Sequence, residues 1–143
     1  MVQAKQGADL HTATFTQMVT YEVSREGFLD RQILKIRGVY GERRQIMLDS
    51  MEEYFPPNVK WTHPQGGLFL WVTLPENLYT MDILEAAINK NVAFVPGTSF
   101  YALGGGENTM RINFSYAAPD NIRLGIERLG LVIKEQLVSF IKN

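Results

Sequence analysis

The sequence predicts an α+β domain in which helices cover one face of a small sheet. Two observations lead to this prediction. Short strand patterns occur only between residues 59 and 114, and helical patterns stand before, among and after them. Long apolar stripes with spacings of three, four and seven residues flank this strand region on both sides. The 143 residues are enough for one domain with its own core.

The composition excludes several functional classes. An apolar content of 45%, a charged content of 20% and a net charge of −1 indicate a soluble globular protein without a nucleic-acid or anionic-membrane partner. The absence of cysteine excludes disulfides, thiolate zinc sites and a cysteine nucleophile. His11 and His63 lie far apart in sequence, so no metal site is expected. No signal peptide or bilayer-spanning stretch is recognised, and we expect a cytoplasmic protein.

The first 27 residues predict two short helices. Residues 1–6 have a helical pattern without a capping signal, and Gly7 stands in the position of a C-terminal cap. This start is typical of the tail of a helix, which suggests that the chain is part of something longer. A second helix is predicted over 14–24, ending near Gly27.

A long helix is predicted over 28–55, and Pro56 stops it. Gly38 and Gly41 interrupt this helix, and each weakens it by about 1 kcal/mol relative to alanine. Its apolar stripe consists of Leu29, Ile33, Ile36, Tyr40, Met47, Met51 and Tyr54. The charged residues assigned to its solvated face are Arg43, Arg44, Asp49, Glu52 and Glu53.

Four strands are predicted downstream of this helix. Both faces of the strand at 68–74 are largely apolar, as in a strand covered on two sides. The four strands are expected over 59–62, 68–74, 92–95 and 110–114.

Two further helices are predicted around these strands. Thr80 is expected to cap a helix over 81–90, with Asp82 in its first turn favoured by the helix dipole. A loop over 98–108 joins the last two strands, and Pro119 opens a final helix from its first position. The stripe of that helix consists of Ile122, Ile126, Leu129, Ile133, Leu137 and Phe140.

Three features are candidates for binding. Arg111 stands inside an otherwise apolar strand, which a salt bridge, a sheet edge or a ligand would each explain; its planar guanidinium suits a carboxylate bound through two parallel hydrogen bonds. Phe100 and Tyr101 follow a strand exit, where aromatics either pack in a turn or wall a small-molecule pocket. Gly66-Gly67 before an apolar strand allows either a bend or the close approach of a ligand.

Other signals are weaker. Gly104-Gly105-Gly106 is interpreted as a connection between strands and not as a phosphate cradle, because neither Lys-Ser nor Lys-Thr follows it and no helix begins there. No nucleophile–base–acid set assembles from the chain.

Three motifs in order resemble a known family. They are HPQGGLFLWVTL at 63–74, VAFVPGTSFY at 92–101 and MRINFSYA at 110–117. Together they resemble the C-terminal part of class I and II pyridoxal-phosphate aminotransferases of fold type I, in the branch with aromatic amino acid, kynurenine and 2-aminoadipate aminotransferases. The resemblance implies a mostly antiparallel small-domain sheet, with residues 1–27 a remnant of the large cofactor domain, 28–58 a connecting helix and 59–143 the small C-terminal domain.

The resemblance also implies roles for individual residues. Arg111 would bind the substrate α-carboxylate, and Thr12 would contact the cofactor phosphate of the neighbouring subunit in a homodimer. The remaining substrate-pocket residues implied are Gly66, Gly67, Phe100 and Tyr101. Tyr116 adds a hint of room for an apolar or aromatic substrate side chain, but the substrate itself stays open.

The residue that would carry the chemistry is absent. Pyridoxal-phosphate catalysis needs a Schiff-base lysine, and none of the six lysines stands in the family's Ser-x-[SH]-Lys context. We therefore expect a C-terminal fragment of an enzyme that moves an amino group from an α-amino acid to a 2-oxo acid, inactive by itself and without stable cofactor binding. A lyase or acyl-transfer variant stays open. The six lysines are Lys5, Lys35, Lys60, Lys90, Lys134 and Lys142.

Two alternatives come from other functional classes. Some bacterial regulators fuse a winged-helix DNA-binding domain to an aminotransferase-like domain, and basic helix-turn-helix sequence before Met1 would favour that reading. The other alternative is a free-standing small domain that acts as an interaction module. In that case the apolar stripe of 28–55 would have to be covered within the chain or drive association.

Overall fold

The computed structural model describes residues 1–141, and side chains as far as Ser139. The chain divides into two compact units, Met1–Gly38 and Val39–Asn143. The predicted boundaries at residues 27 and 58 therefore stay predictions, because the division between the two units falls inside one helix. Phe140 and Lys142 lie outside the described side chains. Within the described part, no helix is both long and apolar enough to cross a membrane.

The first unit is helical. It contains α1 (Val2–Asp9), α2 (Thr14–Ser24) and the beginning of α3 (Phe28–Tyr54). The predicted stop at Gly7 is wrong, because α1 continues to Asp9, where Lys5 and Asp9 form an ion pair at 2.6 Å one turn apart. The predicted bounds of α2 are confirmed. Glu26 and Gly27, in the turn after α2, both have positive φ angles.

The second half of α3 carries the buried part of the predicted stripe. Met47 and Met51 are buried, and Tyr40 and Tyr54 pack against the core. The prediction of a solvated face is confirmed for the three carboxylates Asp49, Glu52 and Glu53. It is wrong for Arg43 and Arg44, which are partly buried and hydrogen-bonded to loops of the sheet.

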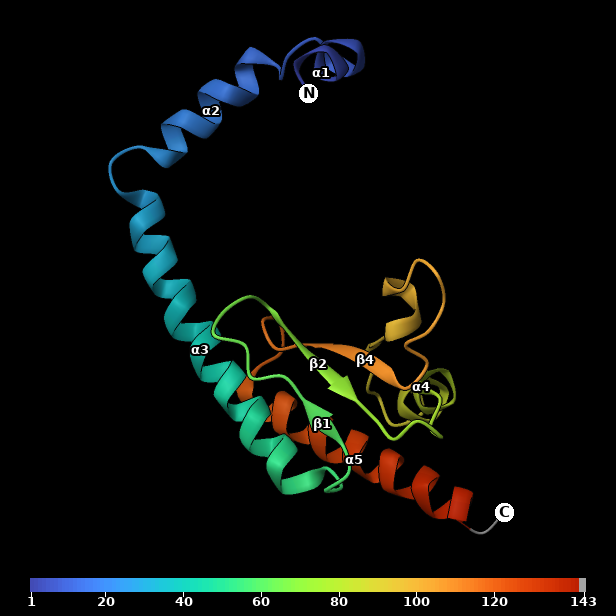
Figure 1. The fold of residues 1–143 in the computed structure, drawn as a ribbon. Helices are drawn as coiled ribbons and strands as arrows, with labels where there is room; N and C mark the ends of the chain where they lie inside the picture. Colours follow the sequence, from blue (N-terminus) through green and yellow to red (C-terminus); the bar gives the residue numbers. More distant parts are fainter. Residues whose placement is uncertain (142–143) are drawn as a thin grey trace. The chain divides into compact units, whose positions relative to one another are not determined.

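The predicted small antiparallel sheet is confirmed, with strand order β1-β2-β4-β3 and all neighbours antiparallel (Figure 1). The strands are β1 (Lys60–Trp61), β2 (Phe69–Thr73), β3 (Val95–Pro96) and β4 (Thr109–Asn113). Between them lie α4 (Thr80–Ile88) and the short 3-10 helix η1 (Gly97–Phe100), and α5 (Pro119–Ile141) follows β4.

The core fills one face of this sheet. Leu70 and Val72 of β2, with Met110 and Ile112 of β4, pack in one cluster with residues of α3 and α5. Figure 1 shows both helices along this face. The expectation that β2 is covered on two sides is wrong, because Phe69 on its other face is 37% exposed. The sheet therefore presents a second, partly open face.

Three local predictions differ from the structure. Thr80 is the first residue of α4 and does not cap it; its hydroxyl donates to Glu107 O at 2.8 Å. The predicted strand at 92–95 shrinks to Val95–Pro96, since Asn91 has a φ of 59° and only two residues pair with β4. Part of the predicted loop at 98–108 is η1.

At Gly130, α5 lies close to the end of α3. A Cβ at Gly130 would lie 2.6 Å from the carbonyl oxygen of Tyr54, a backbone atom, whereas a Cβ at Gly125 on the same helix would meet nothing within 4 Å. The same substitution therefore has opposite effects at the two positions.

We predict that Gly130→Ala lowers the free energy of unfolding by about 1–3 kcal/mol, because the two helices must move apart. Gly125→Ala should raise it by about 0.5–1 kcal/mol, since alanine favours the helix. Urea unfolding of both variants checks this. Equal effects of the two substitutions would contradict the close packing at Gly130.

Thr80 links α4 to the loop before β4. Its side chain is fully buried, and its amide and hydroxyl both donate to Glu107 O at 2.8 Å. We predict that Thr80→Val lowers the free energy of unfolding by about 1 kcal/mol, because it removes one buried hydrogen bond. Thr73→Val, on the partly open sheet face, is the matched control and should cost nothing measurable in thermal unfolding.

Candidate functional site

Arg111 lies in the interior of the sheet, on the face opposite the core. Its strand β4 stands between β2 and β3, and Arg111 pairs with Trp71 on one side and with Val95 on the other. No carboxylate of the described residues forms an ion pair with it. Arg111 is therefore not at a sheet edge, and within the described residues no salt bridge explains its place in the strand.

Two aromatic rings hold the Arg111 guanidinium. Its Cζ lies 4.0 Å from the centroid of the Phe69 ring and 4.6 Å from that of the Phe100 ring. Both distances are within the range of cation–π attraction, which stabilises a desolvated cation more than an exposed one. The rings therefore fix the position of the charge and leave its hydrogen-bond donors free.

One donor of Arg111 is buried without an acceptor. The Nε atom is shielded from solvent and has no hydrogen-bond partner among the described residues, as is also true of Arg44 Nε and Trp61 Nε1. Buried polar groups in native proteins are nearly always hydrogen-bonded, and an unpaired one calls for an explanation. An unpaired guanidinium on an open sheet face is chemically able to bind a planar anion such as a carboxylate.

A small aromatic cluster borders this guanidinium. Trp71 contacts Phe100 edge-on, with ring centroids 5.4 Å apart, and Tyr101 at 6.4 Å. Phe100 and Tyr101 were predicted as pocket residues, and Phe100 lies over Arg111. Phe69 and Trp71 were missed, although strand alternation already placed both on one face of 68–74.

Gly66 and Gly67 lie in the turn just before β2. Gly67 has a φ of 82°, a conformation that side chains rarely adopt, and a Cβ at either glycine would meet nothing within 4 Å. The internal packing of the chain therefore does not require Gly66 to lack a side chain. The amide of Phe114 donates to Leu68 O at 3.1 Å, so the turn lies beside the end of the Arg111 strand.

The glycine-rich connection before β4 holds Tyr101. Gly104, Gly105 and Gly106 all have positive φ angles, and a Cβ at Gly106 would collide with the Tyr101 ring. The carbonyl of Gly106 accepts the amide of Thr109 at 3.0 Å. Gly106 thus has a local role in packing Tyr101 against the loop.

Thr12 belongs to the Met1–Gly38 unit, whereas Arg111 belongs to the Val39–Asn143 unit. It is exposed, and its carbonyl accepts a hydrogen bond from Gln17 Nε2 at 2.5 Å. Its predicted contact with a cofactor phosphate stays a prediction.

None of the described lysines in the Val39–Asn143 unit forms a hydrogen bond or an ion pair with Arg111 or its aromatic neighbours. Lys5 pairs with Asp9 and Lys90 with Glu135, while Lys35, Lys60 and Lys134 are exposed. Lys142 lies outside the described residues. The described residues around Arg111 thus offer a cation that suits a carboxylate and no amine that could hold the aldehyde of pyridoxal phosphate.

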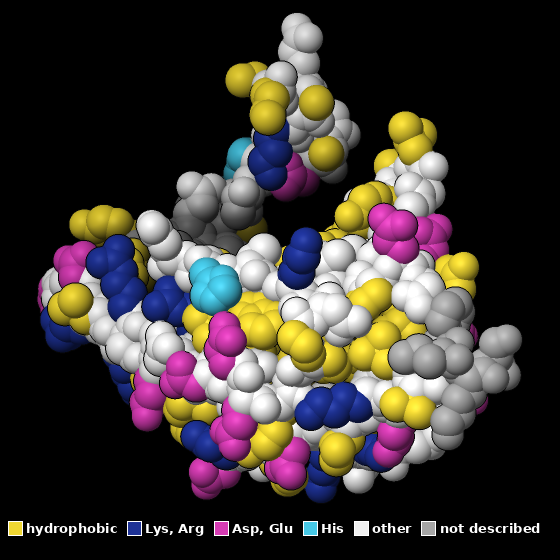
Figure 2. All heavy atoms as spheres, turned by 60° about the horizontal axis from the view of Figure 1, so that its bottom comes forward, with side chains coloured by type: hydrophobic (Ala, Val, Ile, Leu, Met, Phe, Trp, Pro, Cys, Tyr) yellow, Lys and Arg dark blue, Asp and Glu magenta, His cyan; other side chains and the backbone are white. Residues whose placement is uncertain are grey.

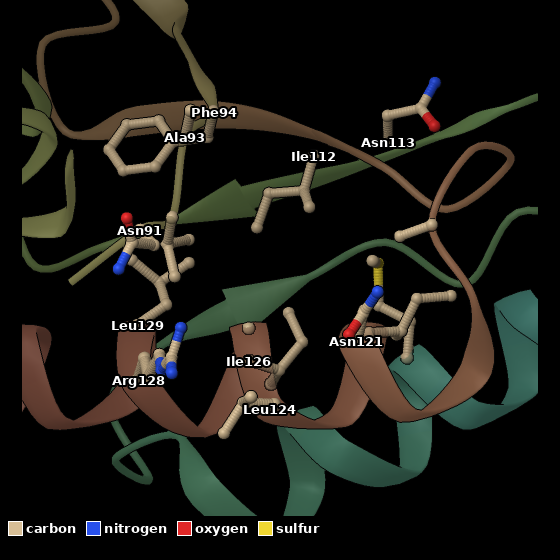
Figure 3. A pocket seen from close by; sticks show the side chains of 15 residues that line it. Asn91, Ala93, Phe94, Ile112, Asn113, Asn121, Leu124, Ile126, Arg128 and Leu129 are labelled. Atoms are coloured by element: carbon tan, nitrogen blue, oxygen red, sulfur yellow. The ribbon is translucent and has the colours of Figure 1, made fainter.

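A separate cavity of about 340 Å³ lies on the core side of the sheet (Figure 3). In Figure 3 Ile112 points from β4 toward α5 into this space. Arg128, the arginine that lines the cavity, donates a hydrogen bond to Lys90 O at 3.2 Å. The cavity therefore lies on the opposite side of the strand from Arg111 and has no comparable free cation.

On the face drawn in Figure 2, the described residues form no large patch of a single charge. Lys and Arg are interspersed there with Asp and Glu. The net charge of −1 is consistent with this mixture.

Comparison with known proteins gives aminotransferases. The chain is 48% identical over 134 residues to aromatic-amino-acid aminotransferase 1 of Thermococcus litoralis, covering 94% of this chain and 32% of that protein. It superposes with a TM-score of 0.88 and 48% identity on Pyrococcus horikoshii kynurenine aminotransferase, solved in complex with PMP, KYN and KYA, covering 94% of this chain and 33% of that one. The chain thus spans about a third of the length of these relatives.

More distant similarity extends to transcriptional regulators. The chain is 28% identical to the HTH-type regulator YdfD of Bacillus subtilis, over 92% of this chain and 27% of that protein. No family model matches the chain.

The family predicted from the three motifs agrees with these comparisons. The chain matches the C-terminal part of an aminotransferase-like protein, and it has the α+β fold of the C-terminal domain of pyridoxal-phosphate aminotransferases.

Proposed function

We propose that this chain provides the substrate-carboxylate site of an aminotransferase that moves an amino group from an α-amino acid to a 2-oxo acid. The observation that supports this most strongly is the Arg111 guanidinium, fixed between Phe69 and Phe100 with its Nε buried and without an acceptor. Amino acids and 2-oxo acids both carry a carboxylate next to the reacting carbon. One cation can therefore bind both substrates of such a reaction in turn.

Arg111 would bind and orient the substrate. Two parallel hydrogen bonds from the guanidinium to a carboxylate fix the plane of that group, and with it the direction of the substrate α-carbon. The sheet makes this orientation rigid, because β4 is paired on both sides. The aromatic cluster of Trp71, Phe100 and Tyr101 excludes water from one side of the cation and thereby strengthens its attraction for an anion.

The proposed cofactor is pyridoxal phosphate, as in the aminotransferases that the chain resembles. When bound, it supplies the electron sink for amino transfer. The lysine that holds it would come from outside these 143 residues, and Thr12 would contact its phosphate in a homodimer, as the motif resemblance implies. This chain's own part in the reaction is substrate binding.

We predict that Arg111→Gln in the full-length gene product lowers kcat/KM for the amino acid by roughly 100- to 1000-fold, because truncating one side of a buried charge pair costs about 3–4 kcal/mol. The absorbance of bound cofactor should be retained. Single-turnover reduction of the cofactor absorbance by each amino acid measures the effect.

Arg123→Gln is the control for this substitution. Arg123 pairs with Glu53 at 3.5 Å, and both side chains are more than half exposed, so its loss should leave kcat/KM unchanged. Equal kcat/KM for Arg111→Gln and the wild type would overturn the carboxylate assignment. A wild-type protein that shows no amino transfer with any α-amino acid would overturn the proposed function.

A further inference from the structure

Two consecutive arginines of α3 each donate a hydrogen bond to a main-chain carbonyl in a different loop. Arg43 Nη1 donates to Ser115 O, and Arg44 Nη1 donates to Pro64 O at 2.8 Å. Both contacts are partly buried, and both lie within the Val39–Asn143 unit. An arginine can span such a gap because its long stem ends in a rigid fork of donors.

The two anchored loops meet at one end of the β2–β4 pair. Phe69 pairs with Asn113, and the amide of Phe114 donates to Leu68 O at 3.1 Å. The turn that begins at Pro64 therefore leads into β2 at the place where Ser115 leaves β4. This end of the pair lies two residues from Arg111, and it carries the Phe69 ring that covers the guanidinium.

The loop after β4 is a preformed unit. Asn113 Oδ1 accepts hydrogen bonds from Ser115 N at 2.8 Å, Ser115 Oγ at 3.0 Å and Tyr116 N at 3.1 Å. A side chain that accepts three bonds from the following residues holds them as one turn. Fixing Ser115 O from α3 thus fixes the whole loop relative to that helix.

The turn before β2 has little internal restraint by comparison. It contains Gly66 and Gly67, which have the greatest backbone freedom and no neighbour within 4 Å of an added Cβ. The bond from Arg44 to Pro64 O is the side-chain contact that fixes this turn to α3.

We propose that Arg43 and Arg44 are positioning residues that set the separation of these two loops and thereby the placement of Phe69 over Arg111. This inference rests on the proposed function, since the loops border the proposed carboxylate site. Neither arginine touches the substrate. Each acts through a main-chain carbonyl, and α3 serves as the common frame for both loops.

The test uses Arg43→Met and Arg44→Met in the full-length gene product, because methionine keeps an apolar stem and removes the donors. Arg37→Met, an exposed arginine earlier on the same helix, is the matched control. We expect each loop variant to raise KM for the amino acid about tenfold with kcat changed less than twofold, since small misplacements at a binding site have large effects. Arg44→Lys, which keeps a positively charged donor group, should restore part of the loss.

A second measurement reads the anchoring without any activity. Hydrogen–deuterium exchange should become faster in peptides covering 65–69 for Arg44→Met and 115–118 for Arg43→Met, while Arg37→Met leaves both unchanged. The double variant should raise KM by less than the product of the single effects, because both bonds hold the same end of the sheet.

The outcomes separate the two proposals. Unchanged exchange in both peptides, or faster exchange with unchanged KM, would overturn the positioning role. Faster exchange in the Arg43→Met and Arg44→Met variants, together with a wild type that shows no amino transfer, would support the anchoring and overturn the proposed function instead.

Discussion

The proposed carboxylate site depends on holding one cation in place on a sheet. The Arg111 guanidinium lies between two aromatic rings, and one of its buried donors has no acceptor. A buried donor without an acceptor is costly, and it persists only when the surroundings hold it. Here the surroundings are two paired strands, the Phe69 and Phe100 rings and the core beneath them. In the proposed function, the carboxylate of a substrate would satisfy the unpaired donor and so relieve this cost on binding.

The asymmetry of the sheet makes this arrangement possible. Strand alternation sends Met110 and Ile112 into the core and leaves Arg111 on the other face. The second half of α3 and the length of α5 close the core face, and the close packing at Gly130 shows how tightly the two helices meet. The same helix α3 also binds two loops of the sheet, because Arg43 and Arg44 donate hydrogen bonds to their main-chain carbonyls. One rigid helix therefore supports both the core and the loops beside the cation.

Much of the fold follows from periodicity. The stripes of α3 and α5, the alternation of β2 and β4 and the stop at Pro56 are local signals, and they give those elements nearly to the residue. The predictions that were wrong concern residues whose contacts lie far away in the sequence. Threonine is a typical N-cap residue, but the hydroxyl of Thr80 donates its hydrogen bond to the carbonyl of Glu107 instead. Arg43 and Arg44 look like solvated residues because their acceptors lie 72 and 20 residues away in the chain. Arg111 could be found from its apolar strand, whereas its aromatic neighbours required the sheet register.

The most direct measurement is a crystal structure of the full-length gene product with a non-reactive carboxylate analogue of an amino acid. We predict that both carboxylate oxygens lie about 2.7–2.9 Å from guanidinium nitrogens of Arg111, with Nε among the donors, and that the Phe69 and Phe100 rings keep their places over the cation. A carboxylate bound elsewhere, with Arg111 Nε still lacking an acceptor, would contradict the role given to this residue.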